Sequence, residues 1–80
     1  MPVRAYVLIQ TEVGKAAEVA ARARQLEGVT GADDVTGPYD VVVTAEASSM
    51  DELGRMVVSR LQVINGITRT LTCPVVVLGD

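Results

Sequence analysis

The chain has 80 residues, of which 49% are hydrophobic, and its seven basic and ten acidic side chains give a net charge of −3. This length fits one domain, residues 1–80, which buries only about 60–65% of the surface of its unfolded chain. The negative charge argues against direct nucleic-acid binding, which depends on a basic surface that displaces counterions.

The chain contains no His and a single Cys, Cys73. These counts exclude an intrachain disulfide, and they also exclude a Cys/His metal site or a Cys–His nucleophile pair within the chain. No apolar run approaches the roughly 20 residues of a membrane span, and Met1-Pro2-Val3-Arg4 is not a signal peptide. We therefore expect a cytoplasmic protein without membrane contact, metal or cofactor.

The first half of the chain predicts a strand, a helix and a weaker strand. The first strand covers residues 3–10, which are apolar at nearly every position. Thr11 is expected to cap a helix that ends near Gly28 and has an apolar stripe at Ala16, Val19, Ala20 and Ala23. Residues 29–35 form a weaker strand, which belongs at a sheet edge because Gly31 interrupts it.

The second half begins with a sharp turn at Gly37-Pro38, which leads through Tyr39 and Asp40 into a buried strand that ends at Ala47. A capping box at residues 49–52 opens a second helix, whose apolar stripe is Leu53, Met56, Val57 and Leu61. This helix ends at residues 63–66. A fourth strand covers residues 67–73 until Pro74 stops it, and residues 75–78 form a short extension.

The order β-α-β-β-α-β predicts an α+β, ferredoxin-like domain. Its four-stranded antiparallel sheet carries both helices on one face, and the first and third strands are central. Alternation then turns one set of side chains towards the helices: Ala5, Val7, Ile9, Val41, Val43 and Ala45.

The opposite face of the sheet is left without a covering layer. Alternation places an apolar centre there, formed by Tyr6, Leu8 and Val42, with Thr44 beside it. The fourth strand is expected to add a threonine border of Thr68, Thr70 and Thr72. This composition is too apolar for bare solvent, so it predicts an interface and at least a dimer.

Several segments together resemble the effector-binding (RAM-type) domain of the Lrp/AsnC transcriptional regulators. The resemblance covers roughly residues 4–78 and is carried by Gly14-Lys15, Gly28-Val29, Thr36-Gly37-Pro38-Tyr39-Asp40-Val41 and Gly66-Ile67-Thr68-Arg69-Thr70. Full family members carry an N-terminal helix-turn-helix, whereas the first predicted strand here begins at Val3. We therefore expect a stand-alone effector domain, with a full-length regulator as a possible partner.

The resemblance implies a dimeric α/β-barrel assembly, with dimers joined in an octamer-like ring and a small effector, usually an amino acid, bound where dimers meet. By position, the ligand contacts implied are Gly37, Pro38, Tyr39, Asp40, Thr68, Arg69 and Thr70. Asp40 would accept from the ammonium group, and Arg69, the threonines or amides near Gly37 would donate to the carboxylate.

Several of these residues also have a purely structural interpretation. Asp40 can satisfy turn amides, Tyr39 can pack towards the helices, and Arg69 can be a solvated edge charge. Three functions follow for the chain: a non-catalytic effector-binding and assembly module, a pure oligomerisation module, or a small barrel enzyme of the monooxygenase or isomerase type. The enzyme is disfavoured because such enzymes use a roomy cavity with a His or several aromatic residues, whereas this chain has no His and only two Tyr.

Overall fold

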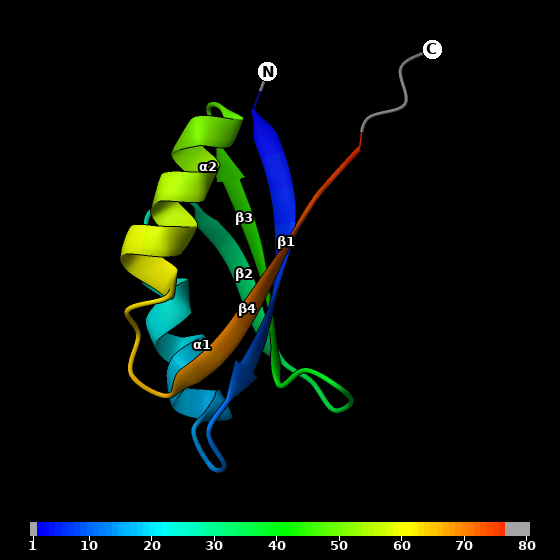
Figure 1. Cartoon of the computed structure of the whole chain (residues 1–80), viewed down its shortest axis with the longest axis vertical. Helices are drawn as coiled ribbons and strands as arrows, with labels where there is room; N and C mark the ends of the chain where they lie inside the picture. Colours follow the sequence, from blue (N-terminus) through cyan, green and yellow to red (C-terminus); the bar gives the residue numbers. More distant parts are fainter. Residues whose placement is uncertain (1, 77–80) are drawn as a thin grey trace.

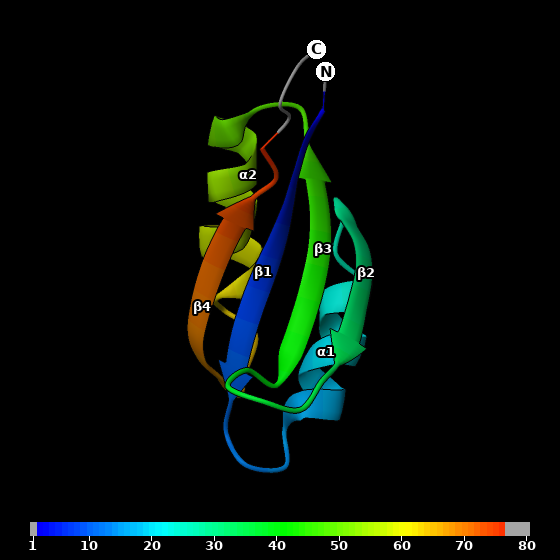
Figure 2. The same ribbon diagram turned by 90° about the vertical axis from the view of Figure 1, so that its right-hand side faces the viewer.

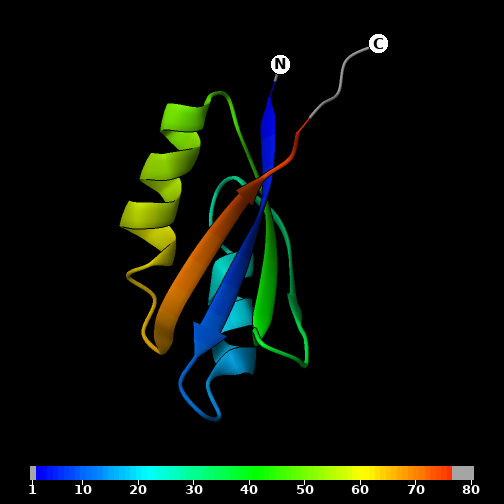
Figure 3. The same cartoon turned by 45° about the vertical axis from the view of Figure 1, so that its right-hand side comes forward.

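The computed structural model describes residues 2–76, and its four strands form one antiparallel sheet. The strands are β1 (Val3–Thr11), β2 (Val29–Asp34), β3 (Val41–Ala47) and β4 (Ile67–Pro74), in the spatial order β2-β3-β1-β4. The helices are α1 (Ala16–Arg24) and α2 (Met50–Met56), and α2 continues as a π-helical segment, η1 (Val57–Leu61). Both helices lie on one side of the sheet (Figure 1, Figure 3). The predicted ferredoxin-like fold with β1 and β3 central is therefore confirmed.

Side-chain alternation along the two central strands builds the core. In the antiparallel register Val7 pairs with Val43 and Ile9 pairs with Val41, so these side chains project to the same face. All six residues predicted to face the helices are fully buried: Ala5, Val7, Ile9, Val41, Val43 and Ala45. They pack against the apolar stripes of the helices, which include Val19, Ala20, Ala23, Leu53 and Leu61. The small side chains of α1 let that helix lie close to the sheet.

The prediction that Thr11 caps the first helix is wrong. Thr11 is the last residue of β1, and α1 begins only at Ala16, with Lys15 at an N-cap that makes no side-chain hydrogen bond. The amide of Thr11 donates instead to the carboxylate of Asp40 at 2.8 Å. The hydroxyl of Thr11 lies 3.4 Å from the same carboxylate oxygen, so both polar groups of Thr11 contact Asp40 rather than the helix.

The predicted threonine border on the open face is also wrong. Leu8 pairs with Leu71, while Thr70 and Thr72 pair with the core residues Ile9 and Val7 and so lie on the helix side. The cause is a bulge: Thr11 pairs with Ile67 and Gln10 with Arg69, so Thr68 is an extra residue. An extra residue shifts the alternation by one position. β4 therefore presents Arg69, Leu71 and Cys73 to the open face.

The second helix begins as predicted but changes its winding. The hydroxyl of Ser49 accepts from the amide of Glu52 at 3.2 Å, which confirms the N-cap. The α-helix ends at Met56, and η1 continues to Leu61 rather than to residue 63. β4 runs to Pro74, one residue beyond the predicted end, and Val75 still donates to Arg4. Residues 77 and 78 of the predicted extension lie outside the described residues.

Two loops at one end of the domain are tied together. The amide of Glu12, after β1, donates to the carbonyl of Gly66, before β4, at 2.8 Å. Gly66 has φ +102°, and a Cβ at this position would lie 3.1 Å from the Cβ of Lys15. Only glycine fits both the conformation and the contact. Among the helices of residues 2–76, none is long and apolar enough to span a membrane.

Replacing Gly66 with Ala should lower the free energy of unfolding by about 3 kcal/mol, because left-handed strain and a steric clash combine. Gly14→Ala is the matched control, since Gly14 has φ +82° but open space around it. That variant should lose only about 1–2 kcal/mol. Denaturant titration measures both, and equal losses would contradict the importance of the contact with Lys15.

Candidate ligand-binding site

The two segments predicted to bind ligand meet at one end of the sheet, on either side of β1. The amide of Asp40 donates to the carbonyl of Ile9 at 2.8 Å, and on the other side Ile9 pairs with Thr70. Figure 2 shows the β2–β3 turn, the end of β1 and the start of β4 together at the lower end of the molecule. Segments about thirty residues apart in sequence thus converge on the last residues of β1.

Gln10 connects the two halves of this site. Its side-chain Nε2 donates to the carbonyl of Pro38 at 3.0 Å, and its backbone carbonyl accepts from the hydroxyl of Thr68 at 3.2 Å. It also pairs with Arg69 across the sheet. Gln10 was not among the site residues predicted from the sequence. The available signal was its place as the polar residue that ends the apolar run of the first strand.

Asp40 is half-buried, and its carboxylate bridges to the end of β1. Oδ2 accepts from the amide of Thr11 at 2.8 Å and lies 3.4 Å from the Thr11 hydroxyl. Asp40 therefore has the structural role considered above, although it satisfies an amide of β1 rather than of its own turn. Within residues 2–76 its other oxygen, Oδ1, makes no hydrogen bond, so one acceptor stays available for a ligand.

The β4 half of the site surrounds a shallow depression of about 320 Å³, lined by Gln62, Ile67, Thr68, Arg69 and Thr70. The hydroxyl of Thr70 accepts from the Gln62 side chain at 2.9 Å on the helix side of the strand. Arg69 is exposed on the other side, and no ion pair in the described part of the chain involves it. The structure therefore does not gather the predicted ligand residues on one face.

The remaining predicted contacts lie in the turn before β3. Gly37 and Pro38 are exposed, Tyr39 is half-buried, and Gly37 has φ +134°. The carbonyl of Pro38 is already engaged by Gln10. The main polar side chain of this turn is therefore the carboxylate of Asp40, which is hydrogen-bonded to the end of β1.

The four residues predicted for the dimer interface lie together on the open face of the sheet. Leu8 pairs with Val42 on one side and with Leu71 on the other, which makes an apolar row across β3, β1 and β4. Tyr6, opposite Thr44, lies in the next row on this face. Tyr6 and Leu71 are each 42% exposed. This apolar surface covers both central strands and is larger than the sequence predicted.

The space between the sheet and the helices is filled rather than hollow. Aliphatic side chains with little or no exposure occupy it, among them Ile9, Val41, Leu53 and Leu61. Of the residues that the structure describes, none with a polar or charged side chain is buried. These described residues include no group of three or more His, Cys, Asp or Glu side chains that could hold a metal ion.

The chain is thus a small ferredoxin-like α+β domain with polar groups from three segments at one end of its sheet. Residues 4–77 match the model of the Lrp/AsnC ligand binding domain, so the chain belongs to this family. An uncharacterized HTH-type transcriptional regulator from Pyrococcus horikoshii, PH1916, is 34% identical over 55 residues. The match covers 69% of this chain but only 37% of that regulator. Through its family, the domain is related to transcriptional regulators.

Solved structures show the same fold. TTHA0845 from Thermus thermophilus superposes with a TM-score of 0.89 at 26% identity, and the match covers 98% of both chains. The transcriptional regulator NMB0573 from Neisseria meningitidis, solved as an L-Met complex, superposes with a TM-score of 0.83 at 20% identity. That match covers 98% of this chain and 52% of the regulator. The same ferredoxin-like domain thus occurs both in a chain of similar length and as about half of a longer regulator.

Replacing Asp40 with Ala should lower the free energy of unfolding by about 1–3 kcal/mol, because the Thr11 amide loses its acceptor. Asp40→Asn keeps an acceptor oxygen and should lose less than half as much. Thermal or urea unfolding measures the difference. If the two variants were equally stable, the bond between Asp40 and Thr11 would not contribute to folding.

Proposed function

We propose that this domain is a non-catalytic module that binds an amino acid or a similar small metabolite between subunits and links the bound state to assembly. The observation that carries this proposal is the convergence at the end of β1. There Asp40 offers a free carboxylate oxygen, and Arg69 offers a guanidinium outside any intramolecular ion pair of residues 2–76. An α-amino acid needs both groups, one for its ammonium and one for its carboxylate.

The arrangement of the threonines refines this proposal. Thr70 is engaged by Gln62 on the helix side, so its hydroxyl is a weaker candidate for ligand contact than the guanidinium of Arg69. Thr68 is exposed and its hydroxyl already donates to Gln10. Gln10 holds the two halves of the site together, since its side chain donates to Pro38 and its backbone carbonyl accepts from Thr68. The L-Met bound to the Neisseria regulator of similar fold is consistent with an amino acid as the ligand.

Assembly would occur through the open face of the sheet. The apolar row of Val42, Leu8 and Leu71 is bordered by the aromatic side chain of Tyr6. Burying such a surface against a second copy stabilises it by about 25 cal/mol per Å² of apolar area. Two sheets packed face to face would form the dimeric barrel, and the sheet ends would remain at its rim, where further dimers close a ring and complete the ligand site. A full-length regulator of the same family is the partner that this surface fits.

A non-catalytic role agrees with the filled core. A barrel enzyme would hold its substrate between the sheet and the helices, where Ile9, Leu53 and Leu61 instead pack without exposure. A pure assembly module would need no acceptor and cation at the sheet end. Calorimetric titration with the twenty amino acids, beside a turnover screen, separates the three functions.

In that titration, Asp40→Asn should weaken binding of the amino acid ligand about ten- to hundredfold, because it removes a charge-assisted hydrogen bond. Arg69→Gln should have a similar effect from the carboxylate side. Asp33→Asn, on the exposed edge strand β2, is the control and should bind normally. If both Asp40→Asn and Arg69→Gln bound the ligand as tightly as the unmodified chain, the site would lie elsewhere.

Replacing Leu8 with Asp should split the dimer or unfold it, since an unpaired charge would be buried at the interface at a cost of several kcal/mol. Val63→Asp tests a similar change at a residue that is 71% exposed and lies outside the sheet. It should leave assembly intact. Sedimentation velocity measures both variants, and a folded monomer of the unmodified chain at micromolar concentration would refute the proposed interface.

A further inference from the structure

A second depression lies far from the β2–β3 turn, at the opposite end of β3. It has a volume of about 380 Å³ and lies between the second helix and the loop that joins α1 to β2. Small-molecule sites commonly have volumes of about 300–1,000 Å³. The turn precedes β3 and this cleft follows it, so the length of the strand, about 20 Å, separates the two. We call this depression the helix-side cleft.

Charged side chains of both signs line the helix-side cleft. Arg55 Nη1 lies 3.5 Å from Glu52 Oε1, and Arg60 Nη1 lies 3.9 Å from Glu27 Oε1, which belongs to the opposite wall. Both distances exceed the roughly 2.7–2.9 Å of a good charge-assisted hydrogen bond. Each guanidinium carries five donors, so most of them remain available. These ion pairs are exposed and loose, and a ligand can open them at little cost.

Arg55 at the end of α2 and Arg60 in η1 line the same wall of the cleft. In an α-helix, residues five apart lie about 140° apart around the axis. In η1 the amide of Gln62 donates to the carbonyl of Val57, five residues back, at 2.9 Å, so residues five apart lie roughly one turn above each other. Arg55 precedes η1 by two residues and Arg60 lies within it, so the π-helical turn separates two residues that both line the cleft. π-helical turns are rare and recur at functional sites.

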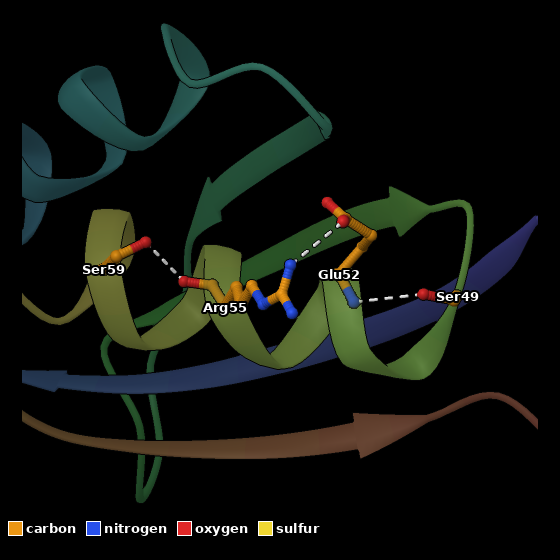
Figure 4. A network of polar contacts seen from close by, with 4 residues as sticks. All are labelled: Ser49, Glu52, Arg55 and Ser59. Atoms are coloured by element: carbon orange, nitrogen blue, oxygen red, sulfur yellow. Dashed lines mark hydrogen bonds and ion pairs between the residues drawn. The ribbon is translucent and has the colours of Figure 1, made fainter.

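Hydrogen bonds hold the backbone of this wall, while its charged side chains form only long, exposed ion pairs. The Ser49 hydroxyl accepts from the amide of Glu52, and the Ser59 hydroxyl donates to the carbonyl of Arg55. Figure 4 shows these contacts at the two ends of the Glu52–Arg55 pair. The serines therefore hold the helix in place, and the guanidinium can turn from Glu52 to a ligand without disturbing the fold.

We infer that the helix-side cleft is a second small-molecule site, separate from the sheet-end site, for a zwitterion that carries both a carboxylate and an ammonium group. A simple anion would release Glu27 and Glu52 without a new partner, in a cleft whose lining has three glutamates against two arginines. A zwitterion replaces each ion pair that it opens: its carboxylate takes the arginines and its ammonium takes the glutamates. The inference does not depend on the proposed function, because it uses none of the same residues.

An NMR titration of the ¹⁵N-labelled full chain tests this inference. L-alanine is the zwitterionic probe, propionate lacks its ammonium group, and ethylamine lacks its carboxylate. L-alanine should shift the backbone amides of Glu27 and Arg60 saturably, with millimolar affinity. Propionate and ethylamine should each bind about tenfold more weakly, since each loses one set of charge-assisted contacts.

Substitutions of single arginines show whether the amide shifts arise from binding in the helix-side cleft. Arg60→Gln and Arg55→Gln should each weaken the cleft shifts about tenfold, while Arg22→Gln should not, although Arg22 forms a similar exposed pair with Glu18 at 3.6 Å. Asp40→Asn should leave the cleft shifts unchanged, so failure at the sheet end and failure at the cleft are distinguishable. The inference is overturned if the cleft amides do not shift, if neither arginine variant weakens the shifts, or if propionate binds as well as L-alanine.

Discussion

The antiparallel pairing of β1 with β3 and β4 is the constraint on which the rest of the structure depends. One set of β1 side chains, Ala5, Val7 and Ile9, is fully buried against the helices. The alternate set, with Tyr6 and Leu8, lies on the open face beside Val42 and Leu71. A shift of one residue in this register would exchange the two sets, so the core, the proposed interface and the proposed sheet-end site all depend on the same pairing.

The end of β1 is where fold and proposed function meet. The carboxylate of Asp40 satisfies the Thr11 amide with one oxygen and keeps the other free, while the Gln10 side chain holds the turn through Pro38. A ligand that draws on Asp40 therefore acts on a residue already bonded to a central strand, and that strand carries Leu8 of the open face two residues before Gln10. In the proposed function, this short path is the route by which ligand occupancy would reach the interface.

Much of the fold could be predicted from local patterns. The alternation of Val7 and Ile9, the stripe of Val19 and Ala23, and the cap at Ser49 each report on structure within a few residues, and all three predictions held. The errors concern interactions between distant residues. The bulge at Thr68 depends on how β4 meets β1, and so the faces of Thr70 and Thr72 could not be read from spacing within the strand.

The site was predictable only in part for the same reason. The turn and the fourth strand were predicted to contact a ligand and do lie on either side of β1, but Gln10, which links them, makes its contacts 28 and 58 residues away. Thr11 was predicted to cap the first helix, but it ends β1, and both its amide and its hydroxyl lie against the carboxylate of Asp40, 29 residues later. The π-helical winding of η1 could not be predicted from the sequence either, because Leu53, Val57 and Leu61 follow the spacing of an ordinary α-helix.

A crystal structure of the chain with the amino acid identified by titration is the most direct test of the central claim. The sheet-end proposal predicts a ligand between two subunits, with its ammonium group within hydrogen-bonding distance of Asp40 Oδ1 and its carboxylate facing Arg69. A ligand held by a single subunit, or one bound away from the end of β1, would contradict it.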